Sequence, residues 1–178
     1  MKKFFLISVL LLLGPLSCLA QTSAQEWPIF RGKADLTGST NIEVSTKPSL
    51  VWNLAATGRT SSSPVVSGGM IFFGNDKGTL IAVGTDGKIK WRYEGGSAAE
   101  APPMVYGDKV IIGLSDGTLH AVYKTSGKLA WRYKTDGQIA GSANAWSTSK
   151  RSGIVIGSYD YYLHSVDPSN GLLQWKLE

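Results

Sequence analysis

The sequence predicts an all-β protein, namely a partial β-propeller built from four-stranded antiparallel blades. The first observation behind this prediction is a segment of about 40 residues that occurs three times in the 178-residue chain. The second is that each copy holds four short apolar runs separated by turns rich in Gly and Asp, as antiparallel strands require. The third is that no stretch beyond residue 20 keeps the 3.6-residue period of an amphipathic helix.

Residues 1–20 have the pattern of an export signal. A basic start at Lys2 and Lys3 precedes an apolar run over residues 4–13, and small residues then allow cleavage after Ala20. The apolar run is shorter than the roughly 20 residues that a membrane-spanning helix needs, so a retained membrane anchor is disfavoured. We therefore expect an exported protein, either periplasmic or secreted.

Cys18 leaves a second interpretation of this end open. Leu16-Ser17-Cys18 resembles part of a bacterial lipoprotein box, although Pro15 stands where that box usually has Leu. In this interpretation Cys18 carries a lipid, the protein is an outer-membrane lipoprotein, and the lipid is its only membrane contact. Cys18 is also the only cysteine, so we expect the mature domain to have no disulfide and no cysteine-based metal site.

The remaining chain divides into a lead-in segment, residues 21–46, and the partial propeller, residues 47–178. Residues 47–54 resemble a lone fourth strand, which comes before three complete repeats of four strands each. In every repeat the second strand ends in a glycine that we expect to mark a close approach of backbones. These glycines are Gly74, Gly113 and Gly157.

A tryptophan at the start of each fourth strand is the clearest mark of the repeat. The four positions are Trp52, Trp91, Trp131 and Trp175, which lie 39, 40 and 44 residues apart. One blade alone cannot bury both of its faces, so blades must stack face to face, and we expect these rings to bridge neighbouring blades as structural residues. Three blades and one strand do not close a ring, so we expect the chain to be the front part of a longer propeller or a truncated one.

The third repeat departs from the other two. It has an insertion at 147–152 between its first and second strands, and Tyr161 replaces a turn glycine. Because long loops at blade ends often carry binding surfaces, Trp146, Lys150 and Arg151 are the predicted partner-binding loop. A hairpin extension without a function is the simpler interpretation, since surface insertions cost little free energy.

The charge distribution argues against a nucleic-acid partner. Without residues 1–20 the chain has 16 Lys and Arg against 13 Asp and Glu. The basic residues are scattered along predicted outer strands, where they protect sheet edges from pairing with other chains. They form no cluster or stripe of the kind that binds a phosphate backbone.

Two histidines and two aspartates recur at matching positions in the second and third repeats. His120 and His164 each follow the strand-ending glycine by seven residues, but Ile81 stands there in the first repeat. A packed histidine is therefore favoured over a metal ligand. Asp116 and Asp160 lie in turns, where capping of the local backbone explains them better than acid–base chemistry does. We predict no catalytic residue, no cofactor and no metal site.

The repeat resembles the pyrroloquinoline-quinone-like (PQQ-like) repeat of bacterial eight-bladed propellers, which ends in Ala-x-Asp-x-x-Thr-Gly-x-x-x-Trp. Residues 121–131 match this pattern with Tyr123 and Ser126 as substitutions, whereas residues 165–175 keep the Asp. The segment 27–32, Trp-Pro-Ile-Phe-Arg-Gly, also looks like the opening of exported members. The resemblance implies an eight-bladed parent ring, of which this chain would supply about three blades.

The same resemblance implies different functions for different members. Quinone-dependent alcohol and sugar dehydrogenases bind their cofactor on the propeller axis with calcium, and the chain would then be the amino-terminal part of such an enzyme. Another member, the propeller lipoprotein of the outer-membrane barrel assembly machinery, is a scaffold without catalysis. A sensor or carbohydrate-associated recognition domain is a third alternative. Since no catalytic constellation is visible, we favour a non-catalytic scaffold whose partners are envelope or other exported proteins.

Overall fold

The computed structural model describes residues 26–178, so the predicted signal peptide and Cys18 lie outside the described residues. The described part contains twelve β-strands and no helix. No helix long and apolar enough to cross a membrane occurs within it. The strands are β1 (Val65–Ser67), β2 (Met70–Gly74), β3 (Thr79–Gly84), β4 (Ile89–Glu94), β5 (Met104–Tyr106), β6 (Lys109–Gly113), β7 (Thr118–Tyr123), β8 (Leu129–Lys134), β9 (Asn144–Ser147), β10 (Ser152–Gly157), β11 (Leu163–Val166) and β12 (Leu173–Leu177).

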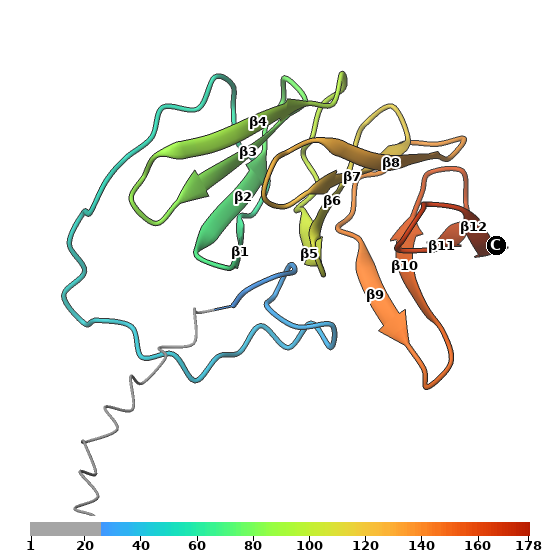
Figure 1. Ribbon diagram of the computed structural model, residues 1–178, viewed down its shortest axis with the longest axis horizontal. Helices are drawn as coiled ribbons and strands as arrows, with labels where there is room; N and C mark the ends of the chain where they lie inside the picture. Colours follow the sequence, from blue (N-terminus) through green and yellow to red (C-terminus); the bar gives the residue numbers. More distant parts are fainter. Residues whose placement is uncertain (1–25) are drawn as a thin grey trace, which may run out of the picture.

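The strands form three separate antiparallel sheets of four consecutive strands each. We call β1–β4 blade 1, β5–β8 blade 2 and β9–β12 blade 3. Figure 1 shows the blades side by side in an arc, with β1, β5 and β9 at the inner side and β4, β8 and β12 at the outer side. This arrangement confirms the predicted all-β class and the partial propeller.

The hydrophobic core lies between the blades. Strand alternation sends Leu80 and Ala82 of β3 toward blade 2, where they pack in one cluster with Val110 and Ile112 of β6. A second cluster joins blades 2 and 3 in the same way, through residues such as Leu119. Each fully buried Leu, Ile or Val side chain among them stabilises the fold by about 1.5–3 kcal/mol. The blades therefore hold together by burying the faces that none of them can bury alone.

The segment 47–54 differs from its prediction as a strand. It forms no strand, because no strand edge among the described residues pairs with it. Its Trp52 nevertheless lies against blade 1, with Nε1 donating to the carbonyl oxygen of Thr85 at 2.9 Å. A side-chain contact thus holds this segment against blade 1.

The glycines that end the second strands permit close approach in two blades of three. A Cβ at Gly74 would collide with the backbone of Ala99, and one at Gly113 would collide with the side chain of Ile139. Both neighbours belong to the segments that connect one blade to the next. A Cβ at Gly157 would meet no described atom within 4 Å, so residues 26–178 show no such close approach in blade 3.

Tyr161 occupies a position whose backbone favours glycine. Its φ is 72°, close to the 80° and 84° of Gly78 and Gly117 in the equivalent turns. Tyr161 is 87% exposed. The turn therefore keeps a left-handed conformation with no buried side-chain contact to offset the strain.

Candidate functional site

The outer seams between blades are built from the repeated tryptophans. Nε1 of Trp91 donates to the carbonyl oxygen of Lys124 at 2.9 Å, and Nε1 of Trp131 donates to that of Pro168 at 3.0 Å. Each ring lies on a glycine of the next blade, so a Cβ at Gly127 would be only 2.7 Å from the ring of Trp91. That glycine has a φ of 68° and stands in the turn before the fourth strand. Trp52 makes the equivalent contacts on blade 1, whereas Trp175 on blade 3 is 38% exposed.

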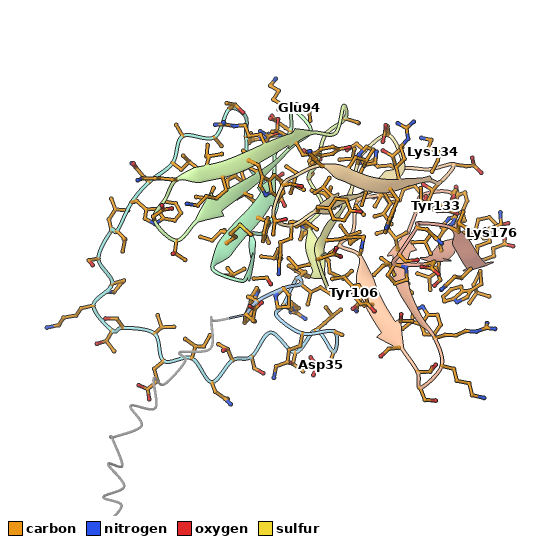
Figure 2. All side chains as sticks on the ribbon, viewed as in Figure 1. Asp35, Glu94, Tyr106, Tyr133, Lys134 and Lys176 are labelled. Atoms are coloured by element: carbon orange, nitrogen blue, oxygen red, sulfur yellow. The ribbon has the colours of Figure 1, made fainter. Side chains whose placement is uncertain are left out.

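A tyrosine and a histidine form a second link across two seams. Tyr93 Oη lies 2.8 Å from His120 Nδ1, and Tyr133 Oη lies 2.9 Å from His164 Nδ1. Tyr133 is labelled in Figure 2, where it stands on β8 at the side of blade 3. Both imidazoles are buried. Burial lowers the pKa of His120 below its ordinary value, because a charged ring would lose its solvation there.

Asp160 extends the second of these links. Its carboxylate oxygens lie 3.0 and 3.2 Å from Nε2 of His164. It also accepts hydrogen bonds from the backbone amides of Asp136 and Tyr162. Burial raises the pKa of Asp160, but these hydrogen bonds outweigh burial and lower it to about 2. Asp116 caps its own turn by accepting from the amide of Thr118 at 3.0 Å.

Residues 27–34 of the lead-in segment lie along the inner edges of the blades. Trp27 exchanges two backbone hydrogen bonds with Val66 of β1, at 2.8 and 2.9 Å. The carbonyl oxygen of Pro28 accepts from the amide of Val105 in β5 at 2.6 Å, and that of Ala34 accepts from Asn144 Nδ2 in β9 at 3.0 Å. The blue segment in Figure 1 shows this course past the inner strands of the arc. One short segment therefore contacts the inner strands of all three blades.

Residues 27–38 of the lead-in segment are themselves tightly folded. Ile29 is 5% exposed and joins the cluster between blades 2 and 3. Arg31 and Leu36 have φ values of 62° and 56°, which fit two consecutive tight turns. The ring of Trp27 packs on Gly32, where a Cβ would lie 2.8 Å away. The sequence did not predict this packing, because backbone pairing at an inner edge leaves no pattern in the side chains.

The predicted partner-binding loop is divided by the structure. Residues 148–151 form a short turn in which Thr148 bonds with Arg151, and Lys150 and Arg151 are exposed. Trp146 instead lies on the face of its own blade, with Nε1 donating to Ser165 Oγ at 2.9 Å. Its ring centroid is 6.4 Å from that of Trp175. The two basic residues and the tryptophan therefore belong to two different surfaces.

The basic turn borders a shallow hollow at one end of blade 3. Its opposite side is the turn between β11 and β12, which includes Asp167 and Ser169. Hydrogen bonds from the Ser169 side chain and amide lower the pKa of Asp167, so its carboxylate stays ionised. The hollow thus presents positive and negative groups side by side. This arrangement suits a charged and polar protein surface better than a small apolar ligand.

Comparison with known proteins identifies the family. A family model described as outer membrane protein assembly factor BamB matches residues 42–178. The chain belongs to this family. Among solved structures, BamB from Moraxella catarrhalis is 28% identical, with a TM-score of 0.63 over 72% of this chain and 40% of that one. The BamB family assignment agrees with the predicted resemblance to the PQQ-like repeat.

Other propellers share the fold at lower identity. A quinohemoprotein alcohol dehydrogenase from Comamonas testosteroni is 20% identical, with a TM-score of 0.65 over 85% of this chain and 27% of that one. The computationally designed Ika4 protein is 18% identical, with a TM-score of 0.64 over 75% of this chain and 81% of that one. The chain therefore spans less than half of the two natural structures. The search of curated proteins gave no match.

The dehydrogenase likeness raises the question of whether these residues fit an axial quinone with calcium. On the inner side, main-chain groups of β1 and β5 and the Asn144 side chain of β9 pair with the lead-in segment, and Ile29 packs into the cluster between blades 2 and 3. Within residues 26–178, no group of three or more His, Cys, Asp or Glu side chains gathers to hold a metal ion. Calcium needs several oxygen ligands, mostly from carboxylates and carbonyls. Residues 26–178 by themselves therefore do not supply a ligand set for that cofactor.

Proposed function

We propose that the chain is a non-catalytic, exported propeller module that binds protein partners in the cell envelope. Membership of the BamB family supports an envelope role, because its family model is that of an outer membrane protein assembly factor. The observation that carries the proposal is the division of surfaces. The inner edges are taken by the lead-in segment, whereas the basic turn at Lys150 and Arg151 is free and exposed.

The chemistry of the basic turn favours an acidic segment of a partner protein. Lys150 and Arg151 project from a turn whose backbone is held by Thr148, so less conformational entropy is lost when a partner binds. Neither residue forms a salt bridge with another described residue. Charge complementarity of this kind sets specificity and the rate of association more than it sets affinity.

Site-specific photo-crosslinking in the envelope of the source organism tests the proposal. A photoreactive residue at position 150 or 151 is expected to give a discrete adduct with an envelope protein, which mass spectrometry identifies. The matched control places the same photoreactive residue at Lys77 or Arg92, which are exposed on blade 1, away from the basic turn of blade 3. Adducts that form equally at all four positions, or at none, would overturn the proposal.

Charge reversal gives an independent measure. Lys150→Glu with Arg151→Glu is expected to lower the adduct yield, or the affinity for the identified partner, at least tenfold. Lys77→Glu with Arg92→Glu makes the same change in net charge and is expected to leave binding within twofold. Equal losses from the two pairs would mean that overall charge, and not the basic turn, determines binding.

A further inference from the structure

The outer seams between blades contain a matched pair of residues. The first member stands two residues after the tryptophan, and the second stands seven residues after the glycine that ends the second strand of the next blade. Across the two seams between blades the pairs are Tyr93 with His120 and Tyr133 with His164. By the same offsets, Leu54 in the segment beside blade 1 corresponds to Ile81. An apolar residue thus goes with an apolar residue, and a tyrosine goes with a histidine.

The physical reason for the match is burial. His120 is 6% exposed and His164 is 3% exposed, so water cannot satisfy their ring nitrogens freely. Tyr93 and Tyr133 provide the missing partners at 2.8 and 2.9 Å. A leucine in place of either tyrosine would leave a buried nitrogen without a hydrogen bond, which is costly. A histidine is therefore compatible with a tyrosine across the seam and incompatible with a leucine.

The outer face of blade 3 repeats the features of these seams, but nothing covers it among the described residues. Trp175 is 38% exposed, whereas Trp131 at the same position in blade 2 is 7% exposed. Leu177, which is 64% exposed, takes the position of Tyr93 and Tyr133. Figure 2 shows the side chains of β12, with Lys176 labelled, at the outer end of the arc. The face is thus continuous with the two seams that join the three blades.

We infer that Leu177 selects the residue at the histidine position of the blade of the same repeat that packs on this face, and that an apolar residue is required there. A turn glycine on that blade would receive the ring of Trp175, as Gly171 receives that of Trp131. Blade 1 of a second copy does not offer this surface, because Trp52 of its own chain already lies on Gly87. The inference does not depend on the proposed function.

Four fusion proteins test the inference. A second copy of residues 95–134 is joined after Glu178, the position equivalent to Glu94, with either His or Ile at its copy of position 120. Each version is made with Leu177 and with Leu177→Tyr. With Leu177, the Ile version is expected to melt about 3–9 °C above the His version. With Leu177→Tyr, the order is expected to reverse.

The outcomes separate the alternatives. A reversed order, in a monomer by light scattering, supports the inference. An order that does not depend on residue 177 overturns the selection by Leu177. If the fluorescence of Trp175 still reports an exposed ring after the blade is added, the docking is overturned. A melting temperature that rises with protein concentration, as in self-association, overturns it as well.

A double-mutant cycle in the chain itself covers the case in which the fusions fail to fold. Tyr93→Leu is expected to lower the melting temperature by about 3–9 °C, because it leaves His120 unpaired. Adding His120→Ile is expected to restore at least half of that loss. Losses that simply add would overturn the matching rule.

Discussion

Replacing Trp131 with alanine tests whether the tryptophan seams hold the blades together. The ring is 7% exposed, lies on Gly171 and donates to the carbonyl oxygen of Pro168 at 3.0 Å. Removing a buried ring of this size costs about 3–5 kcal/mol, and the lost hydrogen bond accounts for about 1 kcal/mol of that. Trp131→Phe keeps most of the buried area, so we expect it to cost about 1–2 kcal/mol.

The assay is urea unfolding followed by far-ultraviolet circular dichroism, which reports the strands and not the tryptophan. Trp175→Ala is the matched control, because the same repeat position is 38% exposed there and has no described blade beyond it. We expect the control to lower the free energy of unfolding by about 1 kcal/mol or less. If Trp131→Ala and Trp175→Ala cost the same, burial at the seam is not the source of the stability.

Three further predictions concern a turn, pH and the lead-in segment. Tyr161→Gly should raise the free energy of unfolding by about 0.5–1 kcal/mol in the same assay, because it relieves a φ of 72° and removes an exposed side chain. A lower free energy of unfolding would show that the Tyr161 ring makes a stabilising contact. Burial lowers the pKa of His120 in the folded protein, so the unfolded chain binds more protons below about pH 6.5, and the free energy of unfolding should fall as the pH drops. Asp160 has a pKa of about 2 against an ordinary 3.8, so it should add a second fall in the free energy of unfolding between about pH 4 and pH 2. Unfolding measured from pH 7.5 to pH 2 checks both, and a flat profile would contradict them. Ile29→Ala should cost about 2–4 kcal/mol, whereas Phe30→Ala, with its ring 39% exposed, should cost less than about 1 kcal/mol; equal effects in the urea assay would mean that the lead-in segment does not pack into the core.

The features predicted from the sequence were those that repeat. A Gly and a Trp at constant offsets predicted the three blades, because each blade buries the same face with residues at the same repeat positions. Residues 47–54, predicted as a lone fourth strand, form no strand, because a strand needs a neighbour and none of the described strands pairs with them. The course of the lead-in segment was also invisible, since Pro28 contacts Val105 through backbone atoms.

The Tyr–His pairs of the seams are visible in the sequence, but only the histidines were noticed. His120 and His164 stood out by their offset, but the tyrosines two residues after the preceding tryptophans did not. Comparing both offsets with Leu54 and Ile81 would have revealed the matched pairs before the structure. For the partner-binding loop, position alone grouped Trp146 with Lys150 and Arg151. The structure separates them, because strand alternation turns the tryptophan onto the blade face.

The most direct test of the account is a calorimetric titration of the protein with pyrroloquinoline quinone in the presence of calcium. The account predicts no saturable binding, because the lead-in segment lies along the inner edges of the blades and no group of three or more His, Cys, Asp or Glu side chains forms among residues 26–178. Stoichiometric binding, followed by dye-linked oxidation of an alcohol or a sugar, would contradict the account and establish a quinone-dependent dehydrogenase.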